Sequence, residues 1–276
     1  MINQDLIQNH IDELFGHNMH AKRVKSLANA THGVIEKGSL AIHAIGAGLA
    51  QACELKRKSA IKQVDRLLSN SKLNVWQLLD SWAAYVIGSR RDIVVSLDWT
   101  EFDADEHATI VLSMQTSHGR NTPLLWKTHK KLGLKGNRNH YEDELLVKLR
   151  EIVPQEIGVT IVADRGFCDT KLFYFLEHEL GFDYIIRIKA TIKVTDAEGQ
   201  LFPVKDFLLP SGRAKTLKNV ELTHQRHPVA KVICTKKKGM RAAWFIASSR
   251  ADLGTPKVLQ LYGKRWGIET SFRDIK

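Results

Sequence analysis

The spacing of apolar residues changes once along this chain, near residue 90, and this change limits the folds that are open to it. Before it, apolar residues recur at helical intervals, as Val24, Leu27 and Val34 do in "HAKRVKSLANATHGVIEKG". After it, β-branched and aromatic residues gather in short runs such as "DIVVSLDWTEF". The pattern predicts an all-helical domain at residues 1–85 and an α/β domain at residues 86–276.

The helical domain is expected to contain short helices, with a basic one near its end. Ser39 in "GSLAIHAIGAGLAQ" and Ser59 in "KRKSAIKQVDRLLSNSKL" are predicted N-caps. Leu40 is one of the apolar residues of the helix after Ser39, and Leu68 is one of the residues of the next helix that are expected to point inward. Two short helices before a basic third suit a helix-turn-helix-like DNA reader, although small basic bundles are common in other proteins. The cations left for the surface are Lys56, Arg57, Lys58, Lys62 and Arg66.

The α/β domain reads as three strands, a helix, a strand, a helix and a strand. The first three strands follow each other directly, which predicts an antiparallel meander. An antiparallel β block at about residues 190–250 precedes a final helix that begins after Pro256. The segments in order are "DIVVSLDWTEF", "HATIVLSMQT", "RNTPLLWKTHK", "YEDELLVKLREIV", "IGVTIVADRGF", "DTKLFYFLEHELG" and "FDYIIRIKA".

The charge balance favours a polyanionic partner. The chain has 41 Lys and Arg residues against 30 Asp and Glu residues, a net charge of +11, which suits nucleic acid. No apolar run approaches a bilayer span and the N-terminus is not a signal peptide, so no membrane partner is expected. Three scattered cysteines favour a reducing cytoplasm over a disulfide or zinc framework, and the histidines lack the spacing of metal motifs.

Two aspartates stand out in the strands. Asp98 lies inside "IVVSLDW", where an ionised carboxylate is costly unless it is paired or binds a metal. A carboxylate hydrogen-bonded to the backbone of a sheet edge is the alternative for Asp98. Asp164 ends the strand "VTIVAD", at the edge where ligand sites of α/β sheets occur. The alternatives for Asp164 are a helix cap or an ion pair with Arg165.

The last stretch, "LYGKRWGIETSFRDIK", reads as one helix with a polar row along it. At about 100° per residue, the row falls within an arc of roughly 80° beside an apolar arc. A salt-bridged, solvated face is the alternative, because Arg265–Glu269 and Glu269–Arg273 are both i,i+4 pairs. The row consists of Tyr262, Arg265, Glu269, Arg273 and Lys276.

The order of elements is that of an RNase H-like domain. In that topology the middle of the first strand lies next to the end of the fourth, which would place Asp98 near Asp164. A carboxylate on a helix packed against these strands would complete a triad. Such acidic clusters suit divalent metals, since Mg²⁺ prefers oxygen ligands and paired metals promote in-line displacement at phosphorus.

These motifs resemble the DDE transposases of the IS4 type, which bacterial insertion sequences encode. Tyr262, Arg265, Glu269 and Lys276 match that family's Y-x2-R-x3-E-x6-K signature, and "LDWTEFD" and "IVADRGF" match its two aspartate motifs. The resemblance spans nearly the whole chain. It implies an α/β fold in which an antiparallel β insertion interrupts an RNase H-like catalytic domain, preceded by an all-α DNA-binding domain.

The resemblance also implies a reaction and its cofactor. Asp98, Asp164 and Glu269 would hold two Mg²⁺ ions, for which Mn²⁺ can substitute. Water would nick DNA at the transposon end, the freed 3′ hydroxyl would form a hairpin, and strand transfer into target DNA would follow. The expected partners are double-stranded DNA with terminal inverted repeats, target DNA and a second copy in a homodimer. The expected location is the bacterial cytoplasm, associated with the nucleoid when bound to DNA.

Several side chains are then expected to contact DNA. Tyr262, Arg265 and Lys276 would bind phosphates near the cleaved end, and Arg265 would also orient Glu269. Trp266 is a candidate for stacking on a base, and a core tryptophan under the sheet is the alternative. The predicted DNA-binding residues are Tyr262, Arg265, Lys276, Trp266, Arg273, Arg57, Lys58, Lys62 and Arg66.

Three other functions compete with this one. Transposases of the family continue beyond the signature lysine, so this chain is expected to transpose weakly or to be a truncated, non-catalytic repressor that binds transposon ends. A simple RNase H-like nuclease or resolvase needs neither the basic helical domain nor the polar row. An aspartyl-phosphate phosphatase, suggested by "LDWTEFD", is excluded because Thr100 stands where that chemistry needs a second aspartate.

Overall fold

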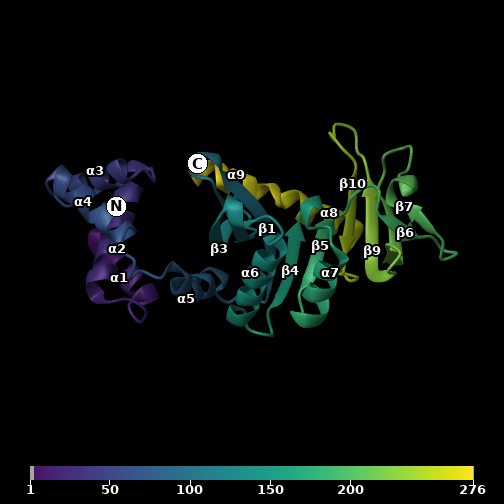
Figure 1. Ribbon diagram of the computed structural model, residues 1–276, viewed down its shortest axis with the longest axis horizontal. Helices are drawn as coiled ribbons and strands as arrows, with labels where there is room; N and C mark the ends of the chain where they lie inside the picture. The colour runs from purple at the N-terminus through teal and green to yellow at the C-terminus, as the bar shows by residue number, and fades with distance from the viewer. Residues whose placement is uncertain (1–2, 276) are drawn as a thin grey trace. The chain divides into compact units, whose positions relative to one another are not determined.

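The computed structural model describes residues 3–275, with side chains up to Asp274. The chain divides into two compact units after Gly88, one helical and one built around a large mixed sheet (Figure 1). None of the described helices combines the length and apolar character that crossing a membrane requires.

The first unit consists of helices packed around two apolar clusters that share α2. One cluster joins α2 to α1 and α5 and includes Phe15, Val24 and Leu78. The other joins α2 to α3 and α4 and includes Leu49 and Val64. The helices are α1 (Gln4–Phe15), α2 (Ala21–Lys37), α3 (Ile42–Ala52), α4 (Arg57–Leu68) and α5 (Val75–Ile87).

Two predicted helix starts are wrong. The Ser39 hydroxyl accepts a hydrogen bond from the Ala41 amide at 3.3 Å, so it closes a turn ahead of α3. Ser59 lies inside the first turn of α4, whose N-cap is Lys56. Leu40 and Leu68 are exposed because Leu40 precedes α3 and Leu68 is the last residue of α4, beside the buried Leu67.

The backbones of α2 and α3 approach each other closely at a glycine. A Cβ atom at Gly33 would lie 2.3 Å from the carbonyl oxygen of Ile45. We therefore expect Gly33→Ala to lower the free energy of unfolding of the first unit by about 1–3 kcal/mol, because the helices must separate.

Urea unfolding of Gly33→Ala and of a matched variant checks this expectation. A Cβ at Gly263 in α8 would meet its nearest atom, in Trp244, at 4.0 Å. Gly263→Ala is thus expected to leave stability unchanged or to raise it by up to about 1 kcal/mol through helix propensity. A Gly33→Ala protein as stable as the unchanged chain would show that the helix contact is not tight.

The second unit contains one ten-stranded sheet in the order β3-β2-β1-β4-β5-β10-β9-β8-β6-β7. The antiparallel meander β1–β2–β3 is confirmed, and β4 lies parallel to both β1 and β5. The outer strands are β3 and β7. The strands are β1 (Asp92–Phe102), β2 (His107–Met114), β3 (Thr122–Lys130), β4 (Gly158–Ala163), β5 (Asp183–Arg187), β6 (Lys193–Thr195), β7 (Leu201–Pro203), β8 (Lys215–Leu222), β9 (His227–Thr235) and β10 (Trp244–Ser248).

The β block at residues 190–250 continues this sheet. β10 pairs antiparallel with β5, with Ala247 opposite Ile186, and β9 and β8 follow on its other side. The block therefore extends the central sheet by hydrogen bonds and does not stand apart as a separate layer.

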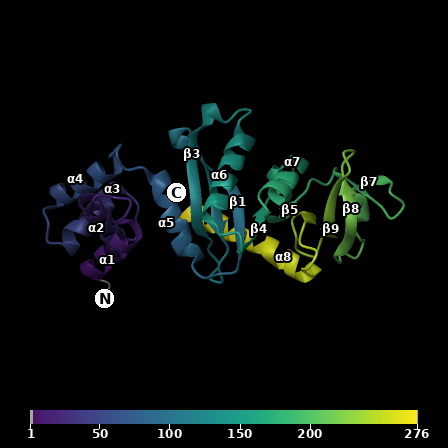
Figure 2. The same ribbon diagram turned by 90° about the horizontal axis from the view of Figure 1, so that it is seen from below.

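Helices cover both faces of the sheet, with α6 and α7 on one side and α8 on the other (Figure 2). Trp99 of β1 points to the α6 side, where its indole N–H donates to Glu142 at 2.8 Å. Because side chains alternate along a strand, Asp98 points to the α8 side. The helices are α6 (Arg138–Ile152), α7 (Thr170–Tyr174, continued by a π-helical turn Phe175–Glu179), α8 (Thr255–Lys264) and α9 (Trp266–Ile275); 3₁₀ turns occupy Asp103–Asp105, Lys131–Gly133, Arg165–Phe167 and Val204–Phe207.

The predicted single C-terminal helix is two helices, α8 and α9, separated at Arg265. The Arg265 amide donates to the Tyr262 carbonyl at 3.1 Å, and the Ile268 amide donates to the Arg265 carbonyl at 3.0 Å. These are i→i+3 bonds, which tighten the turn relative to an α-helix. The predicted polar row depended on a rotation of about 100° per residue along one continuous helix. The tighter turn changes this rotation at Arg265, so Tyr262 points into the core and not along the row.

Candidate active site

Arg265 joins two of the predicted catalytic carboxylates. Its guanidinium donates to Asp98 Oδ2 at 2.8 Å through Nη1 and to Glu269 Oε1 at 3.1 Å through Nη2. The Arg265 side chain is 7% exposed, so the pair with Asp98 is shielded from water. The tight turn between α8 and α9 thus presents Arg265 to the strand that carries Asp98.

The sheet register explains why Asp98 lies under α9. Asp98 is opposite Val111 of β2. Val111 in turn forms a buried cluster with Ile268 and Phe272 of α9. The apolar side of α9 is therefore fixed against β2, and Glu269, the residue after Ile268, is brought to the position of Asp98.

The environment of Asp98 disfavours its ionised form. Burial raises the pKa of Asp98 to about 6, and the negative charges of Asp164 and Glu269 add to this effect. Arg265 and the Trp99 amide, which donates to Asp98 Oδ1 at 2.9 Å, act in the opposite direction. The backbone hydrogen bond considered as an alternative for Asp98 thus coexists with the ion pair.

Asp164 lies beside Asp98 because their strands are neighbours in register. Leu97 of β1 is opposite Ala163 of β4, and the two aspartates are the next residues along these parallel strands. Asp164 Oδ1 accepts a hydrogen bond of 2.6 Å from the Gly166 amide, so Asp164 caps the short turn that follows β4. The capping role considered for Asp164 is present, and it fixes the carboxylate at the end of the strand.

The three carboxylates suit a divalent cation in chemistry and charge. Asp98, Asp164 and Glu269 all act electrostatically on Arg265, and three carboxylates against one guanidinium leave two negative charges. Carboxylate oxygens are also the ligands that Mg²⁺ prefers. Among the described residues, however, no three His, Cys, Asp or Glu side chains are grouped closely enough to hold a metal. Arg265 donates to both Asp98 and Glu269 and so occupies carboxylate oxygens that a metal would use.

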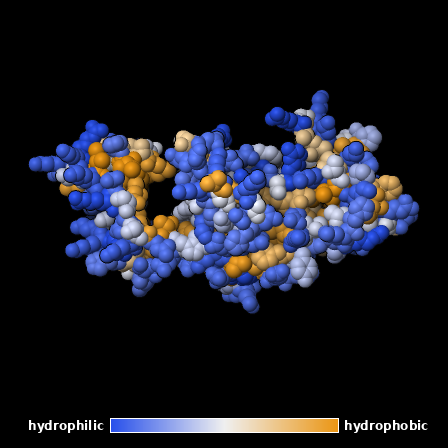
Figure 3. All heavy atoms as spheres, viewed as in Figure 1, coloured by the Kyte–Doolittle hydropathy of each residue, from blue (hydrophilic) through white to orange (hydrophobic). Residues whose placement is uncertain are grey.

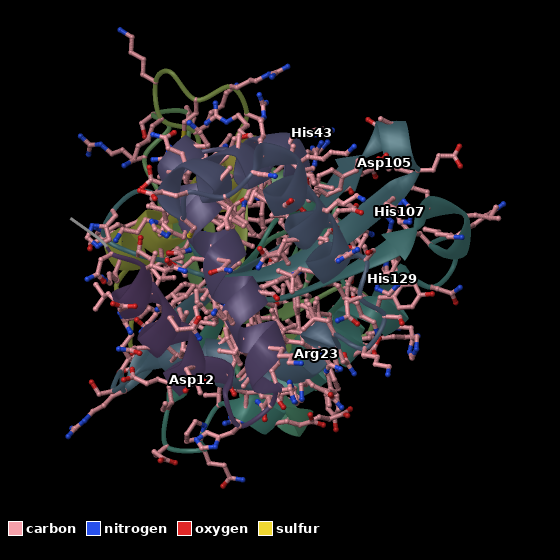
Figure 4. All side chains as sticks on the ribbon, turned by 90° about the vertical axis from the view of Figure 1, so that its left-hand side faces the viewer. Asp12, Arg23, His43, Asp105, His107 and His129 are labelled. Atoms are coloured by element: carbon pink, nitrogen blue, oxygen red, sulfur yellow. The ribbon has the colours of Figure 1, made fainter. Side chains whose placement is uncertain are left out.

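Two histidines on neighbouring strands make local contacts. His107 and His129, labelled in Figure 4, come from the neighbouring strands β2 and β3. His107 Nδ1 contacts the Asp105 carbonyl, and the His129 ring stacks on Tyr141 at 3.7 Å between centroids. Both rings are engaged in local contacts.

An aromatic cluster borders the carboxylates. Trp266 is 42% exposed and stacks on Trp244, with ring centroids 5.6 Å apart and planes at 20°. The guanidinium carbon of Arg265 lies 5.1 Å from the centre of the Trp266 ring. Trp266 is thus not the core tryptophan considered as an alternative, and it leaves part of its ring open to solvent.

The remaining residues of the polar row have different outcomes. Tyr262 is 0% exposed and packs with Val162 and Ile185, so it lies in the core, and its contact with DNA stays a prediction. Arg273 is exposed and donates to Thr270 Oγ1 at 3.3 Å. Lys276 lies outside the described residues. Of the two predicted salt bridges on this helix, the structure contains Arg265–Glu269.

Sequence reasoning missed three polar residues beneath the site. Ser96, Gln115 and Asn121 are joined by hydrogen bonds on the α8 side of the sheet. Ser96 is the one that a signal could have found, because it precedes Asp98 by two residues and so points to the same side of β1.

Cations gather at one place in each of the two units. In the first unit, α2 and α4 border a cavity of about 490 Å³. Arg23, labelled in Figure 4, and Arg66 line it, whereas the predicted Arg57, Lys58 and Lys62 are exposed elsewhere on α4. Its lining residues are Lys22, Arg23, Ser26, Ser59, Gln63, Arg66, Leu67 and Asn70. In the second unit, the loop "KKKGMR" between β9 and β10 forms a hydrophilic projection (Figure 3).

Comparisons with known proteins give one family. The family model described as transposase DDE domain matches residues 89–276. No curated protein matches the chain. A solved structure, Marinitoga piezophila Argonaute in complex with 5′ OH guide RNA, shares 9% identity over 94% of this chain and 46% of that one, so this chain spans less than half of its length. Its TM-score of 0.28 is too low to indicate a shared fold. Because the family match covers more than half of its residues, this chain belongs to the transposases with a DDE domain.

Proposed function

We propose that this protein is a metal-dependent DNA transposase of the IS4 type that cleaves transposon ends and transfers them to target DNA. Asp98, Asp164 and Glu269 are its catalytic carboxylates. The observation that carries the proposal is the place of these three residues: Asp98 lies within β1, Asp164 directly follows the neighbouring parallel strand β4, and Arg265 links Asp98 to Glu269. Each residue comes from a different element, so only the fold brings them together.

The topology of the second unit supports the RNase H-like catalytic domain that this proposal requires. Strands β3-β2-β1-β4-β5 form an antiparallel meander followed by two parallel strands, with α6 between β3 and β4. Helices on both faces bury this sheet, as parallel strands require. The antiparallel strands β6–β10 lie in the sequence between Asp164 and Glu269, where the resemblance places an insertion.

The chain's own residues have distinct roles in the proposed reaction. Divalent cations, when bound, would supply activation of the attacking oxygen and charge for the leaving oxygen at phosphorus. Asp98, Asp164 and Glu269 would hold them through carboxylate oxygens. Arg265, released from Asp98 and Glu269, would then face the phosphate, to which a guanidinium binds through two parallel hydrogen bonds. Trp266 offers an exposed ring on which an unpaired base can stack.

Cleavage of end-containing DNA tests the proposal. A duplex from the DNA that flanks the gene, incubated with the purified chain and Mg²⁺ or Mn²⁺, is expected to be nicked so as to leave a 3′ hydroxyl. Removal of the metal with EDTA should stop the reaction. A chain that binds this duplex but leaves it intact at every Mg²⁺ and Mn²⁺ concentration would contradict the proposal.

One observation favours a second candidate, a non-catalytic protein that binds transposon ends and represses transposition. In the described part of the chain the carboxylates form no metal-binding group, and Arg265 occupies two of them. The same assay separates the candidates, because the repressor would bind the duplex without nicking it. Formation of a homodimer on DNA and a cytoplasmic, nucleoid-associated location stay predictions.

DNA binding by the first unit can be tested at the cavity between α2 and α4. Lys22 and Arg66 come from different helices and line the same cavity, so both can reach one phosphate backbone. We expect Lys22→Ala/Arg66→Ala to weaken binding of a fluorescently labelled duplex about tenfold. The slope of log K against log salt should fall by about 2, one contact for each residue.

A matched cation at the other end of α2 serves as the control. Lys37 donates to Gln51 Oε1 at 2.8 Å and does not line the cavity. Lys37→Ala should leave affinity and salt slope almost unchanged. An equal loss of binding free energy per charge removed in the two proteins would mean that net charge, and not this cavity, sets the affinity.

A further inference from the structure

We propose that Asn121 is a positioning residue that, together with Gln115 and Ser96, holds the turn between α8 and α9 against β1 and so sets the separation of Asp98 and Glu269. The inference rests on the proposed function, since it concerns how the catalytic carboxylates are placed. The three residues lie beneath the site and touch none of its carboxylates in the described hydrogen bonds.

The first anchor runs from Asn121 to the strand of Asp98. Asn121 is 5% exposed, and its Nδ2 donates to Ser96 Oγ at 3.0 Å. Ser96 is fully buried and lies two residues before Asp98, on the same side of β1. A displacement of Asn121 would therefore act on the strand segment that carries Asp98.

The backbone of Asn121 forms the second anchor, on α9. Its amide donates to the Gly267 carbonyl at 3.4 Å, and its carbonyl accepts from Ser271 Oγ at 2.9 Å. Gly267 and Ser271 lie two residues before and two residues after Glu269. Asn121 thus grips the helix on both sides of the glutamate and is bonded to β1 at the same time.

Gly267 allows α9 to approach Asn121 this closely. A Cβ atom at position 267 would lie 2.4 Å from Asn121 Oδ1, a distance at which either group must move. The amide of Asn121 therefore fills the space beside the Gly267 backbone, and the two residues fix the height of α9 above the sheet.

Gln115 supplies the matching anchor for α8. Its Nε2 lies 3.2 Å from Ser96 Oγ and 3.1 Å from the Leu261 carbonyl oxygen. The turn at Arg265 is thus held on its α8 side through Leu261 and on its α9 side through Gly267. Both connections end at the hydroxyl of Ser96.

Directional bonds of this kind define one register between helix and sheet. Apolar contacts such as those of Val111 with Ile268 and Phe272 fix the face of α9 but tolerate small shifts along it. Buried hydroxyl and amide groups lose much free energy if their partners move, so they tie the turn to one position. This position of the turn also sets where the carboxylates lie, because Asp98 is two residues from Ser96 and Glu269 is two residues from Gly267.

The test uses the full chain and two readouts that do not depend on DNA cleavage. Asn121→Ala is expected to weaken Mn²⁺ binding, measured by calorimetry, at least tenfold. In its crystal structure the Arg265–Asp98 contact of 2.8 Å should be lost and Glu269 displaced. Thr235→Val is the control, because Thr235 is 1% exposed and donates to the Gly212 carbonyl at 3.1 Å elsewhere in the sheet. This variant should keep both the Mn²⁺ affinity and the Arg265–Asp98 contact.

Gly267→Ala approaches the same contact from the other side. As a single substitution, Gly267→Ala should weaken Mn²⁺ binding to a similar extent. In the double variant Asn121→Ala/Gly267→Ala it should add less than twofold to the loss, because the side-chain amide of Asn121 that opposes the new methyl group is then absent. Additive losses, or an unchanged Arg265–Asp98 contact in Asn121→Ala, would overturn the positioning role. An unchanged chain that takes up no Mn²⁺ would instead count against the proposed function, and the crystal structures would still decide the role of Asn121.

Discussion

Asp98→Asn is expected to abolish metal-dependent cleavage of transposon-end DNA, with a loss of about 10³-fold or more, as for other residues that act as part of a catalytic unit. Asparagine preserves the shape of the side chain and can still accept from the Trp99 amide, so the strand should keep its structure. It removes the negative charge that the proposed metal site needs. Affinity for the duplex should change little, because Asp98 carries no charge that attracts DNA. Cleavage of labelled DNA and binding in the absence of metal provide the two measurements.

Asp103 offers a matched aspartate for this experiment. It lies in the turn directly after β1, and its side chain is 84% exposed beside Lys131. Asp103→Asn removes the same charge without touching the site, and its cleavage rate should stay within about twofold of the unchanged chain. Asp98→Asn cleaving as fast as Asp103→Asn would remove Asp98 from the catalytic set.

Arg265→Ala is expected to lower the free energy of unfolding at pH 7.5 by about 3 kcal/mol, because it leaves a buried carboxylate without its partner. The loss should be smaller at pH 5. The pKa of Asp98 in the folded chain is about 6, raised above its ordinary value of 3.8, so the folded state binds a proton more tightly than the unfolded state. Stability therefore falls as the pH rises through this window.

Removing Arg265 should make the free energy of unfolding depend more strongly on pH. The guanidinium lowers the pKa of Asp98, so the pKa should rise further in Arg265→Ala, and the window of falling stability should extend toward neutral pH. Urea unfolding at pH 5 and pH 7.5 measures the difference. Arg265→Lys keeps the charge but loses the planar guanidinium that reaches Asp98 and Glu269 together. Its free energy of unfolding should therefore lie between those of the unchanged chain and Arg265→Ala. An equal loss at both pH values would show that Arg265 acts through packing alone.

The sequence predicts most elements of the second unit because their apolar runs are long and well separated. The run predicted at residues 92–102 coincides with β1, Asp92–Phe102. The neighbouring positions of Asp98 and Asp164 also follow from sequence, since in that topology the middle of the first strand lies next to the end of the fourth. Strand propensity and chain order suffice for these features, because both are local or topological.

The interruption at Arg265 does not follow from local pattern. "LYGKRWGIETSFRDIK" contains no proline, and its residues are compatible with a continuous helix. The turn is stabilised by partners distant in sequence: Asp98, 167 positions away, binds Arg265, and Asn121 binds Gly267. Helical periodicity cannot register such contacts, and for this reason Tyr262 was expected beside Glu269 when it lies in the core.

The helix starts near Ser39 and Ser59 fail for a related reason. A serine can cap any turn whose amides it reaches, and tertiary packing decides which turn that is. α3 begins at Ile42, and its N-cap residue Ala41 makes no side-chain capping hydrogen bond. Asn121 was missed although it lies at the start of the predicted strand "RNTPLLWKTHK", because its partners Ser96 and Gly267 are distant in sequence.

The two edge strands of the sheet, β3 and β7, affect how readily the protein aggregates at high concentration. A strand at a rim leaves amide and carbonyl groups unpaired, and a second molecule can use them to start an aggregate. Here β7 is three residues long and ends in Pro203, and β3 carries Pro123 near its start and the exposed Lys130 at its end. Proline lacks an amide proton and lysine resists desolvation, so both rims of the described sheet are poor templates for addition of another strand. The molecule can thus maintain ten strands in one layer without offering a seed for fibrils.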